Sequence, residues 1–272
     1  MPELPEVETT RRGVEPFLRG RRIAALVVRE RRLRQPNPRG LEARLAGADI
    51  LGISRRAKYL LLATERGYAL IHLGMSGSLR IADAGLAPTR HEHYDLRLDN
   101  DRVLRYRDPR RFGLLLWAGA RPERHPLLAR LGPEPLGLDF DGAYLYGASR
   151  SRRAPVKAFL MDSHIVAGVG NIYANEALWR AGIHPRRAAG RIGLARYTLL
   201  AEAVRAVLTS AIAEGGTTLR DFVAAEGSPG YFRIHLTVYD RAGEPCPRCG
   251  TPIRREVIAQ RATYFCPRCQ RY

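Results

Sequence analysis

Residues 2–8 read Pro-Glu-Leu-Pro-Glu-Val-Glu, and the rest of the chain is organised around this stretch. Pro5 suits the first turn of a helix, and the acidic side chains of Glu6 and Glu8 favour its positive end. Apolar residues then recur at helical spacing from Val7 to Leu18. The pattern predicts a helix from about residue 5 to residue 18.

The same stretch has the groups for covalent chemistry. No charged and apolar leader precedes it, so we expect no signal peptide, and we expect Met1 to be removed. Pro2 would then carry a free secondary amine, and an α-amino group has a pKa of about 7.7–8.0 against about 10.4 for lysine. Such an amine can form a Schiff base, and Glu3 could move the protons that this reaction needs. Helix capping is the alternative role.

The chain is strongly basic. It has 272 residues, 45% of them hydrophobic, and a formal net charge of +18. This length allows a real core and about two domains, and no apolar run approaches the ~20 residues of a membrane span. A folded protein this basic is expected to bind a polyanion, with nucleic acid as the leading candidate. A generic solvated surface and an anionic membrane surface are the alternatives.

Lysine is nearly absent from the chain. Of the 45 basic residues, only Lys58 and Lys157 are lysines. A bias that replaces lysine by arginine wherever either serves would leave lysine where a compact ammonium or a tunable amine is needed. Both lysines are therefore candidate functional residues, with chance survival as the alternative.

The N-terminal half is rich in predicted strands. A strand is expected over residues 22–29, a basic loop over 31–40 and a short helix over 41–46. Seven short strand-like runs follow, separated by Gly, Asp and Asn clusters: residues 50–54, 58–63, 68–73, 78–81, 94–98, 103–106 and 112–117. This spacing favours an antiparallel sandwich or barrel.

Two turns between these strands carry unusual residues. Residues 72–78 form a Gly-rich turn with Met75, and residues 108–113 place Arg110 and Phe112 before an apolar strand. Arginine beside an apolar wedge on a loop is one way in which proteins enter DNA between base steps. Met75 and Phe112 could equally belong to the core.

The pattern becomes helical after the Pro/Gly cluster of residues 131–137, which we interpret as an interdomain linker. Helices are expected over residues 154–161, 172–180 and 194–214. Glycines before the second of these helices allow backbone N–H groups to approach an anion, and Asn171 could cap the helix or contact a phosphate.

Four cysteines near the C-terminus give the most specific local signal. Cys246-x-x-Cys249 and Cys266-x-x-Cys269 are separated by sixteen residues, the spacing of a structural zinc site with four thiolates. Two disulfides are the alternative, although reduced thiols suit a cytosolic protein. The segment between the pairs reads as two strands and a tip, a hairpin from which Arg261 would project.

These landmarks occur in one order along the chain: PELPEVE at the N-terminus, KYLLL at residues 58–62, HLGMSG at 72–77, DPRRFG at 108–113, GVGNIYANEAL at 168–178, and the paired CxxC motifs. In this combination the chain resembles the formamidopyrimidine-DNA glycosylases, the bacterial 8-oxoguanine repair enzymes, over nearly its whole length. Leu4 stands where the sister family, endonuclease VIII, usually has Gly, which favours the purine-specific branch. Asp240 departs from the pattern, because the family commonly has Gly at this position.

The resemblance implies an α+β multidomain fold. An N-terminal antiparallel β-sandwich with a leading catalytic helix would span residues 1–131, and residues 132–144 would form a linker or hinge. A helix–two-turn–helix DNA-binding domain would span residues 145–235, with a lesion-recognition loop at about 215–231. A zinc-finger hairpin would occupy residues 236–272, and DNA would lie in a basic cleft between the lobes.

The resemblance also implies the catalytic residues. Pro2 matches the terminal proline that attacks C1′ of the damaged nucleotide, and Glu3 matches the residue that assists base loss and sugar opening. Glu6 matches a nearby acid, and Lys58 matches an active-site lysine that supports catalysis and contacts phosphate. Arg261 completes this set.

Seven positions would contact DNA: His72, Met75, Arg110, Phe112, Lys157, Asn171 and Arg261. Among them, Asn171 and Arg261 match the pair that grips the phosphates flanking the lesion. His72 matches another phosphate contact, and Lys157 matches a residue near the damaged base. The other three match the residues that fill the gap left by the extruded base, since flipping costs a few kcal/mol of stacking and pairing. The arginine among them could hydrogen-bond the orphaned cytosine.

The implied function is base-excision repair. The enzyme would flip an oxidised purine out of duplex DNA, release it through a Schiff base on Pro2, and cleave the strand by β- and δ-elimination as an AP lyase. One zinc ion would be structural, because four cysteine ligands leave no open position for catalysis. The partner would be damaged double-stranded DNA and not a membrane, and the protein would act as a monomer in the bacterial cytoplasm, associated with the nucleoid.

Two other functions stay open on the sequence. An endonuclease VIII-type enzyme would act on oxidised pyrimidines, and a damage-binding protein on the same scaffold would bind DNA without chemistry. The presence of Pro2, Glu3 and Lys58 together weighs against the second, because a pure binder has no need of a terminal secondary amine.

Overall fold

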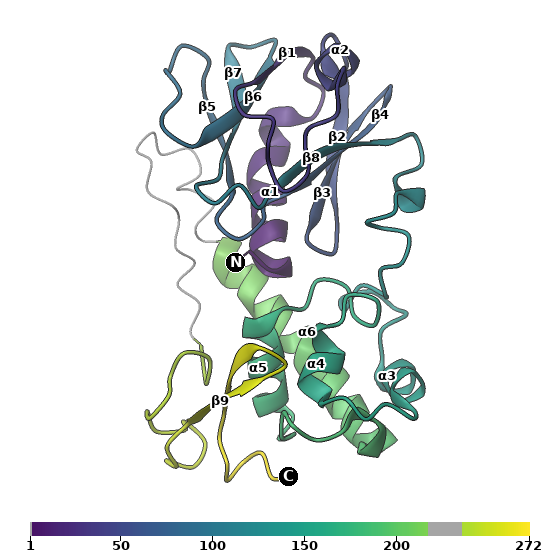
Figure 1. Cartoon of the computed structure of the whole chain (residues 1–272), viewed down its shortest axis with the longest axis vertical. Helices are drawn as coiled ribbons and strands as arrows, with labels where there is room; N and C mark the ends of the chain where they lie inside the picture. The colour runs from purple at the N-terminus through teal and green to yellow at the C-terminus, as the bar shows by residue number, and fades with distance from the viewer. Residues whose placement is uncertain (1, 217–235) are drawn as a thin grey trace. The chain divides into compact units, whose positions relative to one another are not determined.

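The computed structural model describes residues 2–216 and 236–272, whose contacts group them into two units. One unit comprises residues 2–129 with 212–216, and the other comprises residues 130–211 with 236–272. The first carries the β-sheets, and the second carries most of the helices and the C-terminal hairpin (Figure 1). The predicted linker begins just after the division between the units.

The first unit contains two four-stranded antiparallel sheets. One sheet has the strand order β1 (Ile23–Val28), β6 (Glu92–Leu98), β7 (Arg102–Arg107) and β5 (Ser78–Asp83). The other has the order β2 (Ile50–Arg56), β3 (Tyr59–Thr64), β4 (Gly67–His72) and β8 (Leu114–Gly119). The predicted antiparallel β-domain with a leading helix is confirmed.

Helix α1 (Leu4–Leu18) packs against both sheets, contacting β2 and β3 of one and β5 of the other (Figure 1). Val7, Val14 and Leu18 are buried in a core to which both sheets contribute. Each such side chain stabilises the fold by about 1.5–3 kcal/mol, so the helix that begins after Pro2 is firmly anchored. A short helix, α2 (Leu41–Leu45), packs on β1.

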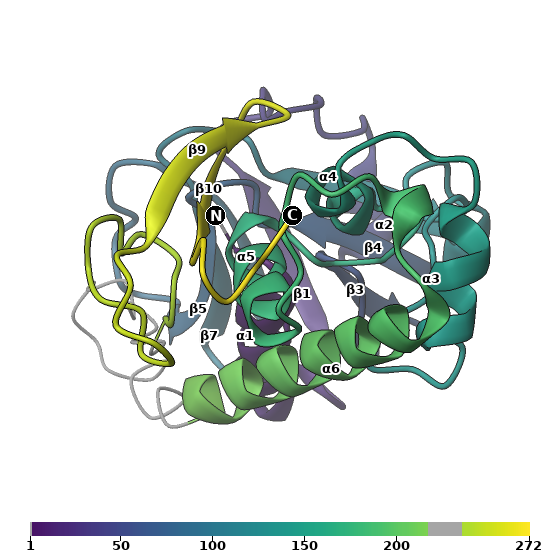
Figure 2. The same cartoon turned by 90° about the horizontal axis from the view of Figure 1, so that it is seen from below.

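The second unit contains helices and a two-stranded hairpin. Its helices are α3 (Gly142–Ser149), α4 (Val156–Met161), α5 (Asn171–Arg180) and α6 (Leu194–Gly216), the last of which belongs to this unit up to residue 211. Strands β9 (Arg254–Ile258) and β10 (Arg261–Phe265) form the hairpin, which lies alongside α5 (Figure 2). Short 3₁₀ turns occur at Pro122–Arg124 in the first unit and Ala189–Arg191 in the second.

Helix α3 was absent from the sequence prediction. Gly142 and Gly147 lower the helix propensity of this segment. The helix forms because Asp141 caps it, accepting the backbone N–H of Tyr144 at 2.7 Å.

Most predicted boundaries differ from the observed ones by one or two residues, and three of these differences involve candidate site residues. The strand expected over residues 112–117 begins two residues later, because the N–H of Gly113 donates to the carboxylate of Asp108 at 2.9 Å. Lys58 lies in the two-residue turn between β2 and β3 rather than in a strand. Arg261 is the first residue of β10 rather than part of the hairpin tip.

Candidate active site

Pro2 and Glu3 lie at the start of α1. Glu3 is the N-cap, is only 1% exposed, and forms a capping box with Glu6. The backbone N–H of Glu3 donates to Glu6 Oε2 at 2.7 Å, and the Glu3 carboxylate accepts the backbone N–H of Glu6. The capping role therefore exists. It fixes the Glu3 carboxylate beside Pro2 at the positive end of a helix.

Glu8 connects this helix to the turn that carries Lys58. Burial alone would raise the pKa of Glu8, but hydrogen bonds from two arginines of its own helix outweigh burial and lower the pKa. The Glu8 carboxylate also accepts from Arg55 Nε of β2 at 3.1 Å. Arg55 in turn donates to the carbonyl of Ala57 at 2.9 Å, one residue before Lys58. No pattern in the sequence indicated this connection.

His72 ends β4, and its ring packs against Tyr59 with centroids 4.8 Å apart. Its Nδ1 accepts the backbone N–H of Gly74 at 2.9 Å, so the neutral ring carries its proton on Nε2. Burial and the positive charges of Arg34 and Lys58 lower the pKa of His72 to about 4. The ring is therefore neutral at physiological pH and has one N–H to donate.

This low pKa predicts an acid-sensitive first unit. Between the ordinary pKa of 6.5 and the folded value of about 4, the unfolded state binds a proton that the folded state does not bind. Stability should therefore fall as the pH drops through this window, with up to about 3 kcal/mol lost at His72. Thermal unfolding between pH 7 and pH 4 measures this effect. His72→Asn should flatten the pH dependence, and identical slopes in the two proteins would contradict the assignment.

Met75, Arg110 and Phe112 lie on two loops of the first unit. Met75 follows β4, and the other two residues follow β7. Phe112 is 43% exposed and Met75 is 37% exposed, so the alternative that they are core residues is wrong. The guanidinium carbon of Arg110 lies 4.8 Å from the centroid of the Phe112 ring, a cation–π contact.

In the second unit, Lys157 and Asn171 both hold the start of β10. Lys157 is 1% exposed, and its Nζ donates to the carbonyl of Ala262 at 2.9 Å and to Thr263 Oγ1 at 2.7 Å. Asn171 Nδ2 donates to the same Ala262 carbonyl at 3.0 Å. Arg261, the preceding residue, is exposed. The structure thus brings these candidates together and leaves the arginine facing solvent.

One side of helix α5 hydrogen-bonds to the C-terminal segment that carries the four cysteines. Asn175 Oδ1 accepts a backbone N–H of β10 at 2.8 Å, and Glu176 accepts three successive backbone N–H groups at 2.8–2.9 Å. Trp179 Nε1 donates to Cys246 Sγ at 3.4 Å. With Asn171, these residues place one side of the helix against the finger.

Asp240, the residue that departs from the resembled pattern, adopts a φ of 63°. This left-handed region favours glycine, and Asp is among the residues that tolerate it best. Its Oδ1 accepts a hydrogen bond from the Tyr264 hydroxyl at 3.1 Å, which ties this turn to the hairpin.

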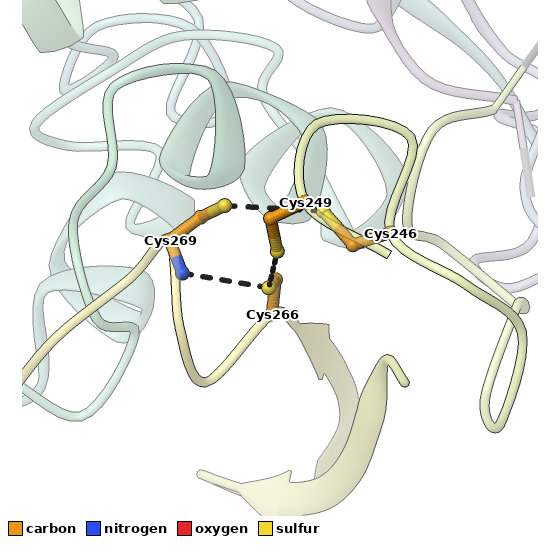
Figure 3. Close-up of side chains that lie close together, drawn as sticks. All are labelled: Cys246, Cys249, Cys266 and Cys269. Atoms are coloured by element: carbon orange, nitrogen blue, oxygen red, sulfur yellow. Dashed lines mark hydrogen bonds between the residues drawn. The ribbon is translucent and has the colours of Figure 1, made fainter. Parts of the chain in front are cut away.

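The four cysteines converge at the base of the hairpin (Figure 3). Their Sγ atoms lie within 4.8 Å of one another, with 3.9 Å between Cys246 and Cys269 and 3.5 Å between Cys249 and Cys266. Zn–S bonds of about 2.3 Å in a tetrahedron place sulfurs about 3.8 Å apart, whereas a disulfide joins them at about 2.05 Å. The donors fit zinc, and the disulfide alternative is wrong.

The candidate residues divide between the two units. The first unit holds Pro2, Glu3, Glu6, Lys58, His72, Met75, Arg110 and Phe112, and the second holds Lys157, Asn171, Arg261 and the cysteines. The lesion-recognition loop predicted at residues 215–231 begins with the end of α6 and lies outside the described residues from position 217 onward.

Three family models match successive parts of the chain. The formamidopyrimidine-DNA glycosylase N-terminal domain matches residues 1–115, and the H2TH domain of the same family matches residues 131–223. The zinc finger found in FPG and IleRS matches residues 243–271. The chain belongs to the formamidopyrimidine-DNA glycosylase family.

Relatives of this family match over their full length. The formamidopyrimidine-DNA glycosylase of Methylococcus capsulatus is 60% identical over 271 residues, which cover 100% of both chains. The crystal structure of the MutM (Fpg) protein from Thermus thermophilus has 42% identity and a TM-score of 0.85, covering 99% of this chain and 98% of that one. Lactococcus lactis FPG in complex with a Fapy-dG containing DNA has 33% identity and a TM-score of 0.88, covering 99% of this chain and 100% of that one.

Family membership confirms several predictions. The chain is an enzyme, a DNA glycosylase and AP lyase. Its finger binds one structural Zn²⁺ through four thiolates, which stabilise the hairpin and leave no open position for a substrate. Within residues 2–216 and 236–272, no helix combines the length and apolar character needed to span a membrane.

Proposed function

We propose that this glycosylase removes oxidised purines, 8-oxoguanine and formamidopyrimidines, from duplex DNA and cleaves the strand at the abasic site that results. The observation that carries the proposal is the buried Glu3 carboxylate, fixed beside Pro2 by a capping box. The net charge of +18 supports a nucleic-acid substrate. The solved complex of the Lactococcus lactis relative with Fapy-dG DNA supports the lesion class.

Pro2 is the nucleophile in this proposal, once Met1 has been removed. Its secondary amine attacks C1′ of the damaged nucleotide, the C1′–N9 bond breaks, and the base leaves. The Glu3 carboxyl protonates the ring oxygen as the sugar opens, and the amine loses its proton, so that a Schiff base joins Pro2 to C1′. The resulting iminium acidifies C2′, and successive β- and δ-elimination expels the two flanking phosphates.

Four side chains hold the DNA phosphates near the lesion: Lys58, His72, Asn171 and Arg261. The lysine and the arginine supply full charges, whereas His72 supplies a neutral Nε2–H, because its Nδ1 already accepts a backbone N–H. Lys157 is buried against the hairpin and supports Arg261 through the neighbouring carbonyl. Such phosphate contacts position the duplex without reading its sequence.

Phe112→Ala should weaken binding to lesion DNA more than binding to undamaged DNA. In the proposal the exposed ring fills the gap left by the flipped base, and such stacking contributes about 1–3 kcal/mol, or roughly 5–150-fold in affinity. Non-specific binding depends on phosphates instead. Dissociation constants for a duplex with 8-oxoguanine opposite cytosine and for its undamaged counterpart measure the difference.

Leu86→Ala is the matched control, because Leu86 is an apolar loop residue of the same unit with 45% exposure. The control should bind both duplexes as the wild type does. Equal losses of affinity on both duplexes in Phe112→Ala would refute the proposed insertion.

A comparison of lesions separates the proposal from its rivals. The purine-specific enzyme should excise 8-oxoguanine faster than thymine glycol from otherwise identical duplexes. An endonuclease VIII-type enzyme would show the reverse order, and a damage-binding protein would bind without releasing a base. The substrate is chromosomal DNA, so the proposed place of action is the bacterial cytoplasm at the nucleoid, with the protein acting as a monomer.

A further inference from the structure

We propose that Asp108 is a positioning residue that holds the two DNA-inserting loops together as one assembly. The inference rests on the proposed insertion of Met75, Arg110 and Phe112. One loop comprises residues 73–77 and carries the methionine, and the other comprises residues 108–113 and carries the remaining two. Asp108 itself is 0% exposed, so it acts through these loops and does not touch DNA.

The Asp108 carboxylate accepts hydrogen bonds from both loops. Its Oδ1 accepts from Ser76 Oγ at 2.6 Å and from the backbone N–H of Arg110 at 3.2 Å. Its Oδ2 accepts from the backbone N–H of Gly113 at 2.9 Å and from the hydroxyl of Tyr106 at 3.0 Å. Both oxygens thus accept hydrogen bonds from the loop of residues 108–113. Oδ1 also accepts one from the loop of residues 73–77.

These bonds lie next to the inserting side chains. Ser76 directly follows Met75, and Gly113 directly follows Phe112. The loops also touch through their backbones at Gly74, where φ is +70° and an added Cβ would lie 2.5 Å from the carbonyl carbon of Phe112. The carboxylate and the close backbone contact therefore fix the spacing of the exposed methionine and phenylalanine.

The site requires a carboxylate rather than an amide. All four donors point at Asp108 oxygens, and an asparagine would replace one oxygen by an NH₂ group that can only donate. A donor would then face a donor in a buried place, and such an unsatisfied group destabilises the local arrangement. Asp108→Asn therefore disturbs the loops with almost no change in side-chain volume.

The test compares two rates in the full-length protein. Excision of 8-oxoguanine opposite cytosine in a duplex needs the inserted loops, whereas cleavage of single-stranded DNA at a preformed abasic site does not. Asp108→Asn and Ser76→Ala should each lower the first rate about tenfold or more and leave the second within about twofold. Ser76→Ala removes a half-buried hydroxyl that donates to Asp108 and accepts the backbone N–H of Arg110 at 3.3 Å. The Asp108 carboxylate stays in place in this variant, so Ser76→Ala tests the inference if Asp108→Asn fails to fold.

A double variant shows whether Asp108 acts through the loop. Asp108→Asn should add little to the loss caused by Phe112→Ala, because both remove the same function. The inference would be overturned if the two rates fell equally, or if duplex excision were unchanged in both Asp108→Asn and Ser76→Ala. It would also be overturned if the losses of Asp108→Asn and Phe112→Ala were fully additive. A wild-type protein that excises no 8-oxoguanine would instead overturn the proposed function.

Discussion

Glu3→Gln is expected to slow base excision about 10²–10⁴-fold while binding to lesion DNA persists. The amide keeps the size of the carboxylate and one oxygen that can accept the backbone N–H of Glu6 in the capping box. Helix α1 should therefore still begin at the same residue. In the proposed mechanism Glu3 gives a proton to the sugar ring oxygen, and the amide cannot supply it. Single-turnover excision of 8-oxoguanine opposite cytosine gives the rate, and fluorescence anisotropy on the same duplex gives the affinity.

Glu15→Gln is the matched control for this change. It makes the same change of charge on the same helix, at a residue that pairs with Arg11 and has no place in the proposed chemistry. The control should excise at the wild-type rate. Wild-type excision by Glu3→Gln would remove Glu3 from the mechanism, and equal losses in the two variants would show that charge, not proton transfer, is responsible.

Loss of zinc is the second change with a large expected effect. Structural zinc binds zinc-finger peptides with about 10–16 kcal/mol of apparent free energy. Here its four thiolates close the base of the hairpin that presents Arg261. Cys246→Ser should therefore lose the metal and weaken duplex binding by more than about tenfold. Metal analysis and a dissociation constant at one fixed salt concentration measure both effects on one preparation.

Chelation provides the control for the substitution itself. A chelator should reproduce the behaviour of Cys246→Ser in the wild-type protein, and added Zn²⁺ should restore binding in the wild type alone. A metal-free protein with unchanged affinity for duplex DNA would show that the finger does not need its zinc to hold Arg261.

Hydrophobic periodicity predicted the helix and strands of the first unit well, because each of these elements buries apolar side chains that recur at the spacing of a helix or a strand. The helix expected over residues 5–18 occurs as α1, and each expected strand occurs within about two residues of its predicted bounds. The turns were harder to predict. Ala57, Ala259 and Gln260 all have positive φ, a conformation that alanine and glutamine rarely adopt and that their presence in a sequence does not predict. Lys58, beside the first of these, therefore lies in a turn and not in a strand.

Sequence motifs supplied the candidate site but not the contacts within it. Lys157 was expected near the damaged base, and the structure shows its ammonium bound to Ala262 and Thr263, more than a hundred residues away in the chain. Such partners can be found only once the fold is known. Asp108 belongs to the DPRRFG motif, but nothing in the sequence shows that four donors surround its carboxylate.

Borohydride trapping tests the central claim, that Pro2 is the nucleophile. After removal of Met1 the chain has three candidate amines: the terminal nitrogen of Pro2 and the side chains of Lys58 and Lys157. The purified protein is mixed with a duplex that contains 8-oxoguanine opposite cytosine, reduced and digested, and the cross-linked peptide is identified by mass. The account predicts an adduct on Pro2 and none with undamaged DNA. An adduct on either lysine, or no adduct despite tight binding to the lesion duplex, would contradict it.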